Sequence, residues 1–467
     1  MTRRIRLVSS VERYEGVRVI GAPENGRAIY ITNSERSSWT CPKRGWFRHV
    51  EGLRTTARRR GIDYGTAWHD FLHDVHGYWF ATDAPYPDDG ETRCWACHGF
   101  GMVTEPPISA CARCVGTGLG VVTRLRAKFA AEAKAAGDAG YPDDRDDLLR
   151  DAEILARAAD GWLRVNGRAP PESYRLIGVE VAVARAVLVP GTTHPYTPET
   201  YLTVDSAGAR LAATGEAANP PDGARVVTVR WPYYQIGRLD SVWQHRRTGA
   251  IYVAEWKSAV DPTDVARSLG VDPQTTGYCW LVQGAVENDA FVLPDGVARI
   301  AGVWFDAAYN GMQYDPESLK KGGLSVAKNR TVPSWRFSAA VTAMGLDPLV
   351  YDEHVAYLAA HVDPKLYVRD TIGIPEDDQD RYAEELYGFC VQHSAWRRAG
   401  ARARTQVDIN VAFPRQPVCR LTGGRCEFTG PCLADGEGVR EKYEVKTGQR
   451  WTPEAVPGQG VIEWDPR

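Results

Sequence analysis

The sequence predicts an α/β protein in which a mixed β-sheet is flanked by helices. Residues 236–243 alternate with the period of two that is typical of a half-buried strand, and residues 250–257 follow as a second strand after a polar turn. Residues 174–189 form the strongest isolated strand pattern. A helix is expected to open at Pro273, because proline is favoured at the first helical position. Strands and helices thus share the middle of the chain.

Composition sets the broad class. With 467 residues, a prior of roughly 150 residues per domain suggests about three structural units. The 43% hydrophobic content, 15 Trp and 21 Tyr argue against disorder. A net charge of −3 gives no global basic field, so nucleic-acid binding would depend on local runs such as 54–60 and 397–404, which could equally be solvated faces. We expect a soluble, cytoplasmic protein, because no apolar run approaches the ~20 residues of a membrane span and Met1 is not followed by a secretory signal.

The remaining elements are expected from local pattern and turn residues. In chain order they are an irregular or β-rich lead-in (1–33), helical stretches (34–60 and 64–72), a linker (81–93), a cysteine-rich insert (94–118), helices (121–165), a Pro/Gly/Thr loop (190–222), central strands (226–257), a strand (298–305), a polar loop (313–335), further helices (336–403) and a polar, peripheral tail after about 436.

The hairpin formed by residues 236–257 carries the clearest chemical signal. An antiparallel turn would bring Asp240 and Glu255 together, with Lys257 two residues further along on the same face as Glu255. Two carboxylates and an ammonium at one strand end are costly to bury unless a cation joins them. The hairpin therefore predicts a site for a hard divalent metal with a charge stabiliser beside it.

Three further positions extend this signal without deciding it. His69, His73 and His76 lie at i, i+4 and i+7 of one expected helix face, which raises the odds of a metal role for one of them but does not select it. Glu180 is either an outward-facing strand residue or a further carboxylate near the metal. Gln274 and Tyr278 are helical neighbours that could bind phosphate or sugar oxygens, or only support packing.

Ten cysteines in a reducing compartment favour metal centres over disulfides. Two CxxCxGxG repeats place paired thiolates on tight glycine-containing turns, which suits one closed structural zinc site. Their ligands are Cys94, Cys97, Cys111 and Cys114. The repeats resemble the zinc modules of J-domain chaperones over about 25 residues, as a local motif and not as a sign of chaperone function. Three late cysteines, Cys419, Cys426 and Cys432, need a fourth ligand, for which Cys41 and Cys390 are available.

The order of these motifs resembles the PD-(D/E)XK nuclease superfamily, in its RecB-type branch with an iron–sulfur cluster. The resemblance rests on Gly65 to His69, Gly237 to Asp240, Glu255 to Lys257 and Gln274 to Tyr278, together with one early and three late cysteines. It implies a restriction-endonuclease-like core with helical N- and C-terminal parts, an inserted zinc finger and a C-terminal iron–sulfur segment. The expected parts are an N-terminal helical part (1–90), the finger and arm (91–165), the nuclease core (166–312), a C-terminal helical part (313–435) and a tail (436–467).

The same resemblance implies the ligand sets. Mg²⁺ or Mn²⁺ would be held by His69, Asp240, Glu255 and the backbone carbonyl of Trp256, and an imidazole ligand favours Mn²⁺. Lys257 would orient the attacking water or stabilise the transition state, with Gln274 and Tyr278 close to the reacting phosphate. A structural [4Fe–4S] cluster would be held by Cys41, Cys419, Cys426 and Cys432.

We therefore expect a metal-dependent DNA exonuclease that acts on single strands or duplex ends, in DNA recombination, repair or phage DNA processing. A helicase, recombinase or integrase could be its partner. The chain carries no P-loop, so motor activity would need another chain. One alternative is a nucleic-acid-binding scaffold within a helicase or integrase complex, with little cleavage of its own. Another is an RNA-directed zinc protein that depends on the finger.

Overall fold

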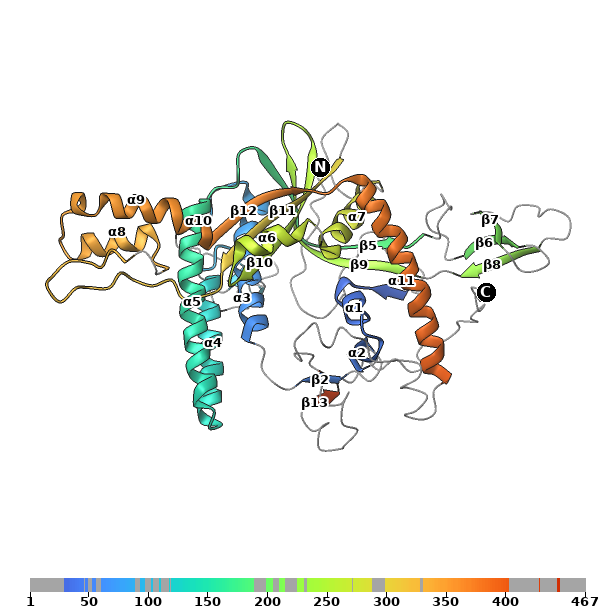
Figure 1. Cartoon of the computed structure of the whole chain (residues 1–467), viewed down its shortest axis with the longest axis horizontal. Helices are drawn as coiled ribbons and strands as arrows, with labels where there is room; N and C mark the ends of the chain where they lie inside the picture. Colours follow the sequence, from blue (N-terminus) through green and yellow to red (C-terminus); the bar gives the residue numbers. More distant parts are fainter. Residues whose placement is uncertain are drawn as a thin grey trace.

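The computed structural model shows a central β-sheet with helices packed on both faces (Figure 1). The α/β class and the mixed sheet flanked by helices are therefore confirmed. The structure describes residues 29–45, 47–48, 53–55, 60–88, 93–96, 102–103, 109–110, 117, 119–188, 199–204, 210–214, 225–230, 233–270, 272–287, 299–327, 331–402, 428 and 443–445.

Six strands form the central sheet, and its centre is an antiparallel meander. The strands are β1 (Ile29–Ile31), β5 (Tyr174–Ala186), β9 (Tyr233–His245), β10 (Ala250–Ala259), β11 (Arg299–Tyr309) and β12 (Tyr367–Gly373). The order is β1-β9-β10-β11-β12, and β5 also pairs with β9. The pairs β5–β9, β9–β10 and β11–β12 are antiparallel, whereas β10–β11 and β1–β9 are parallel.

Two apolar cores cover the two faces of this sheet. On one face, α3 (Arg60–Thr82), α4 (Val121–Asp138) and α5 (Pro142–Asn166) bury a tryptophan-rich core. On the other, α7 (Pro273–Glu287) and α11 (Glu376–Arg402) bury mainly aliphatic side chains. In β10, Val253 points into the second core while Ala254 and Trp256 point into the first, which is the alternation expected of a sheet buried on both sides. Side chains can therefore approach the middle of β9 and β10 from α3 on one face of the sheet and from α7 on the other.

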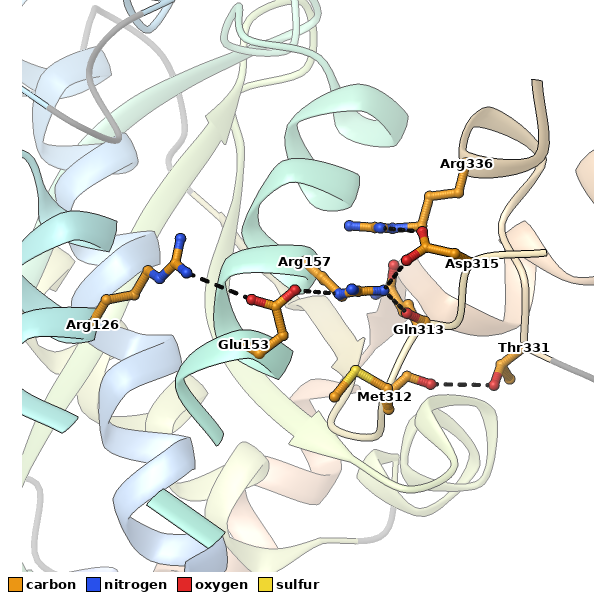
Figure 2. A network of polar contacts seen from close by, with 8 residues as sticks. All are labelled: Arg126, Glu153, Arg157, Met312, Gln313, Asp315, Thr331 and Arg336. Carbon is orange, nitrogen blue, oxygen red and sulfur yellow. Dashed lines mark hydrogen bonds and ion pairs between the residues drawn. The ribbon is translucent and has the colours of Figure 1, made fainter. Parts of the chain in front are cut away.

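The helix pair α4–α5 stands out from the core as a long arm, and charged side chains tie its base to the segment before α8 (Ser334–Ala343) (Figures 1 and 2). Arg157 on α5 donates to Glu153 at 2.5 Å and to Asp315 at 3.0 Å. Arg336 on α8 donates to the other oxygen of Asp315 at 2.7 Å. Arg126 of α4 lies 3.6 Å from Glu153. This row of alternating charges links α4 and α5 to Asp315 in the segment before α8 and to Arg336 on α8.

The other elements are short. They are α1 (Asn33–Ser38), α2 (Pro42–Gly45), β2 (Leu53–Thr55), β3 (Met102–Val103), β4 (Ser109–Ala110), β6 (Glu199–Val204), β7 (Arg210–Thr214), β8 (Arg225–Arg230), α6 (Pro262–Leu269), a 3₁₀ turn (Pro348–Val350), α9 (Asp352–His361), α10 (Asp363–Leu366) and β13 (Tyr443–Val445). None of the described helices has the length and apolar character that crossing a membrane requires.

Several expectations about individual segments are wrong. Residues 34–60 are not one helical stretch, because Pro42 and Gly45 limit α2 to one turn and β2 then pairs with β13 from the tail. The loop expected over 190–222 contains β6 and β7, which pair as a small sheet with β8, so β8 is not a strand of the central sheet. Residues 336–403 are interrupted by strand β12. The partners of β2 and β12 are distant in sequence, so no local pattern reveals those two pairings, whereas β6 and β7 pair as neighbours in sequence.

The expected linker over 81–93 is also partly wrong. Tyr86 is buried, and its hydroxyl donates to Asp74 of α3 at 2.7 Å. The backbone N–H of Tyr86 donates to the carbonyl of Arg168 at 2.6 Å. This segment is therefore packed against α3 and the end of α5 before the chain enters the cysteine-rich insert.

Candidate active site

The site lies where β9 and β10 separate. The two strands pair from Gln244–Ile251 as far as Ser241–Ala254. One residue further along this register, Asp240 stands opposite Glu255. Beyond this point a side chain takes the place of the backbone hydrogen bonds between the strands. The Oδ2 atom of Asp240 accepts a hydrogen bond from the backbone N–H of Trp256 at 2.7 Å. The fork opens the sheet locally, so side chains from both of its faces can meet there.

From one face, α3 delivers His69. Its Nδ1 lies 3.2 Å from Asp240 Oδ1, and its side chain is 35% exposed. Burial alone would lower the pKa of His69, but the carboxylates of Asp240, Glu255 and Glu180 outweigh it and raise the pKa to about 9. Gly65, one helical turn earlier, faces Ser258 of β10, and a Cβ at this position would lie 3.7 Å from the Ser258 hydroxyl, an ordinary van der Waals distance.

His76, two turns after His69 on the same helix, has another role. His76 is fully buried, and its ring packs against Trp79, Trp243 and Trp256. It bonds to the Ser241 hydroxyl through Nδ1 at 3.3 Å, and burial lowers its pKa well below the usual value. His76 is thus an uncharged core residue, and the contact with Asp240 is what distinguishes His69.

From the other face, α7 delivers an amide and a phenol. Gln274 Nε2 donates to Glu255 Oε1 at 3.2 Å and lies 3.0 Å from the Tyr278 hydroxyl. Gly237 on β9 leaves room for this helix, since a Cβ there would lie 2.8 Å from Leu281 and 3.1 Å from Tyr278. The glycine of the Gly237–Asp240 motif therefore has a packing reason.

Glu255 and Lys257 form an ion pair at the fork. The Glu255 side chain is only 4% exposed. Burial, with Asp240 adding to it and Lys257 opposing it, raises the pKa of Glu255 to about 7. Burial would lower the pKa of Lys257, but Glu255 raises it, so the ammonium stays charged. The structure thus brings together His69, Asp240, Glu255, Lys257, Gln274 and Tyr278, as the motifs predict.

Glu180 of β5 completes the row of acids, which the sequence left open. The β5–β9 register pairs Val179 with Ser241 and Val181 with Leu239, so Glu180 stands opposite Asp240 on the side away from Glu255. Its backbone is left-handed, with a φ of 51°. Its side chain pairs with Arg238, a residue that sequence reasoning did not single out. Burial and the Asp240 carboxylate raise the pKa of Glu180 to about 7.

The donor set suits a hard divalent cation. Carboxylate oxygens with one imidazole nitrogen are ligands that Mn²⁺ accepts and that Mg²⁺ accepts in part. Among the described residues no three acidic, histidine or cysteine side chains are already arranged as a metal cage. Both oxygens of Asp240 and one oxygen of Glu255 instead hold protons of His69, Trp256 and Lys257. A cation would replace part of this proton network and relieve the crowded negative charge.

Of the four cysteines expected to hold an iron–sulfur cluster, the structure describes Cys41. Cys41 is buried directly before α2, whereas Cys419, Cys426 and Cys432 lie outside the described residues. Two contacts bring the late segment toward this region: the Phe47 and Phe428 rings are 5.7 Å apart, and β13 pairs with β2. Cys390 is buried in the second apolar core, close to Tyr382 and Leu386 on its own helix.

Of the expected zinc ligands, Cys94 lies within the described residues, where it is buried; Cys97, Cys111 and Cys114 lie outside them. Within the insert, β3 pairs antiparallel with β4, and Arg93 forms an isolated bridge with Leu119. Trp95 packs edge-on against Tyr78 of α3 at 5.2 Å, which anchors the insert. The side chains of the basic runs 54–60 and 397–404 lie outside the described part of the chain.

Comparison of the chain with protein-family models found no match, and comparison with curated proteins found none either. The fork between β9 and β10 and the side chains that meet there are therefore the basis for assigning a function.

Proposed function

We propose that the protein is a divalent-metal-dependent deoxyribonuclease of the PD-(D/E)XK type that acts on single strands or duplex ends. One observation carries the proposal: Asp240 is held at the β9–β10 fork between His69 and the Glu255–Lys257 pair. In chain order, α3 supplies His69, β9 supplies Asp240, and β10 supplies Glu255 and Lys257, while α7 adds Gln274 and Tyr278. This order is what allows four short motifs from distant segments to converge on one strand end.

Asp240, Glu255 and His69 would hold the metal, with the backbone carbonyl of Trp256 as a further ligand. When bound, Mg²⁺ or Mn²⁺ lowers the pKa of a coordinated water and neutralises charge on the scissile phosphate. Lys257 keeps its proton next to Glu255 and can donate to the attacking water or to a phosphate oxygen as charge develops. Gln274 fixes the Glu255 carboxylate and, with Tyr278, presents donors beside it.

A nucleic-acid scaffold is the weaker alternative. Stability alone does not favour placing three carboxylates next to one another in buried positions, because each pays a desolvation cost that a binding surface has no need to pay. The elevated pKa values of Glu180 and Glu255 record that cost. Groups perturbed in this way cluster at catalytic sites. The zinc and iron–sulfur centres are proposed as structural, bracing the arm and the C-terminal segment.

A single experiment separates the candidates. Labelled single-stranded DNA, duplex DNA and RNA are incubated with Mg²⁺, Mn²⁺ or EDTA, and products are resolved on a gel. The proposal expects cleavage of DNA with metal and none with EDTA. Metal-independent binding of DNA without cleavage would support the scaffold, and metal-independent RNA affinity would support an RNA-directed zinc protein.

A further inference from the structure

The strands β5 and β9 both change face at the same pair of residues. In a regular strand, residues two apart share a face. Val179 nevertheless points into the core under α3 and Val181 into the core under α7. On β9, Leu239 lies in the α7 core, whereas Ser241 bonds to His76 of α3. The irregularity therefore falls on Glu180 and Asp240, and it redirects the two acidic side chains together.

The left-handed backbone of Glu180 is costly for a residue other than glycine. Its ion pair does not compensate, because Arg238 is 38% exposed and ion pairs at such positions contribute little. A β-branched residue with regular backbone at this point of β5 would be the more stable choice. Stability therefore does not explain the irregular backbone at Glu180, and we look for its role in the side chain that Glu180 positions.

It positions Arg238. The guanidinium is held by Glu180, two residues before Asp240 on the same strand, and remains partly open to solvent. A guanidinium presents a planar fork of donors that matches a phosphate. The charge of Arg238 also acts on Asp70 of α3, as do the charges of Arg124 and Lys128 on α4. Cationic side chains therefore continue from the site toward α4.

On the proposed nuclease function, we infer that Arg238 is a substrate-positioning residue that binds a backbone phosphate of the DNA next to the scissile one. In the free protein Glu180 holds the guanidinium in place. On binding, the phosphate takes over from Glu180 as the partner of Arg238, and the Glu180 carboxylate is released toward Asp240.

The test is the salt dependence of DNA binding. A fluorescein-labelled single-stranded oligonucleotide is titrated with protein in Ca²⁺ between 50 and 200 mM NaCl, and a gel checks that the DNA stays intact. Each phosphate contact on a single strand contributes about 0.7 to the slope of log K against log salt. Arg238→Gln is expected to weaken binding about tenfold and to reduce that slope by about 0.7. The matched control, Arg247→Gln, changes an exposed arginine in the turn at the far end of the hairpin and should alter neither.

Glu180→Gln separates the inference from a structural role. It leaves Arg238 without its countercharge, so DNA binding should tighten by a few-fold at low salt with the slope unchanged. If Arg238→Gln keeps the wild-type slope, or Glu180→Gln only lowers the melting temperature, the pair is a structural contact and the inference is wrong. If the wild-type protein binds no DNA under any of these conditions, the proposed function itself fails.

Discussion

Replacing Lys257 by glutamine separates catalysis from folding. The side chain contributes one charged donor at the fork, 32% exposed, and its partner Glu255 is 4% exposed. Loss of one donor aimed at a developing charge lowers kcat by about 10²–10³, or about 2.7–4 kcal/mol. We expect Lys257→Gln to show this loss in single-turnover cleavage of labelled DNA with Mn²⁺, with little change in KM because the donor acts mainly in the transition state.

The same substitution has a smaller effect on stability, for a reason visible in the structure. Removing the ammonium leaves a buried carboxylate, which costs about 1–3 kcal/mol when unpaired. Glu255 can escape part of this cost, because its pKa is already about 7 and Gln274 still donates to it. Urea unfolding should therefore show a loss of about 1–2 kcal/mol, and the variant remains folded in the activity assay. Lys365→Gln, an exposed position on α10, is the control. A Lys257→Gln protein with kcat within threefold of wild type would refute the role assigned to this side chain.

Three further predictions concern the frame around the site. Gly237→Ala should destabilise by about 1–3 kcal/mol in urea melts, because the new Cβ would lie 2.8 Å from Leu281; an unchanged midpoint would mean that α7 shifts freely. Burial would raise the pKa of Asp315, but its bonds to Arg336 and Arg157 lower it, so its stabilising effect is present above the unfolded pKa and is lost as pH falls through the folded one. Asp315→Asn should thus cost about 1 kcal/mol at pH 7 and converge with wild type once the pH falls below the lowered, folded pKa of Asp315; a constant difference would contradict the ionic origin. Cys41→Ser should remove absorbance near ~400 nm from the purified protein, whereas loss of colour in Cys390→Ser would place the fourth ligand on α11.

The juxtaposition of the two acids could be predicted from the sequence, because both lie in one hairpin. Counting from the turn pairs Asp240 with Glu255, and the observed register agrees with that count. The helix that carries Gln274 was predictable from its leading proline. The helix expected over 64–72, which carries His69, lies within the longer α3. Their convergence follows from the order of helix, meander, helix and strand.

Some features could not be predicted from the sequence, because they depend on contacts with residues distant in the chain or on a single backbone dihedral angle. Strand β12 has a half-exposed, polar pattern at the edge of the sheet, and only pairing with β11 distinguishes it from the helices around it. Three imidazoles at helical spacing looked equivalent until the tryptophan cage around His76 and the contact of His69 with Asp240 separated them. The φ of Glu180 leaves no trace in sequence, so its partnership with Arg238 was missed.

The most direct test of the central claim is the rate of Mn²⁺-dependent DNA cleavage by Asp240→Asn. Asparagine keeps the size of the side chain and can still accept the Trp256 N–H, but it removes the charge that a cation requires. The site described here predicts a loss of at least about 10² in rate, while Asp264→Asn on the exposed face of α6 retains wild-type activity. An Asp240→Asn protein that degrades DNA at the wild-type rate would contradict the assignment of this fork as a nuclease centre.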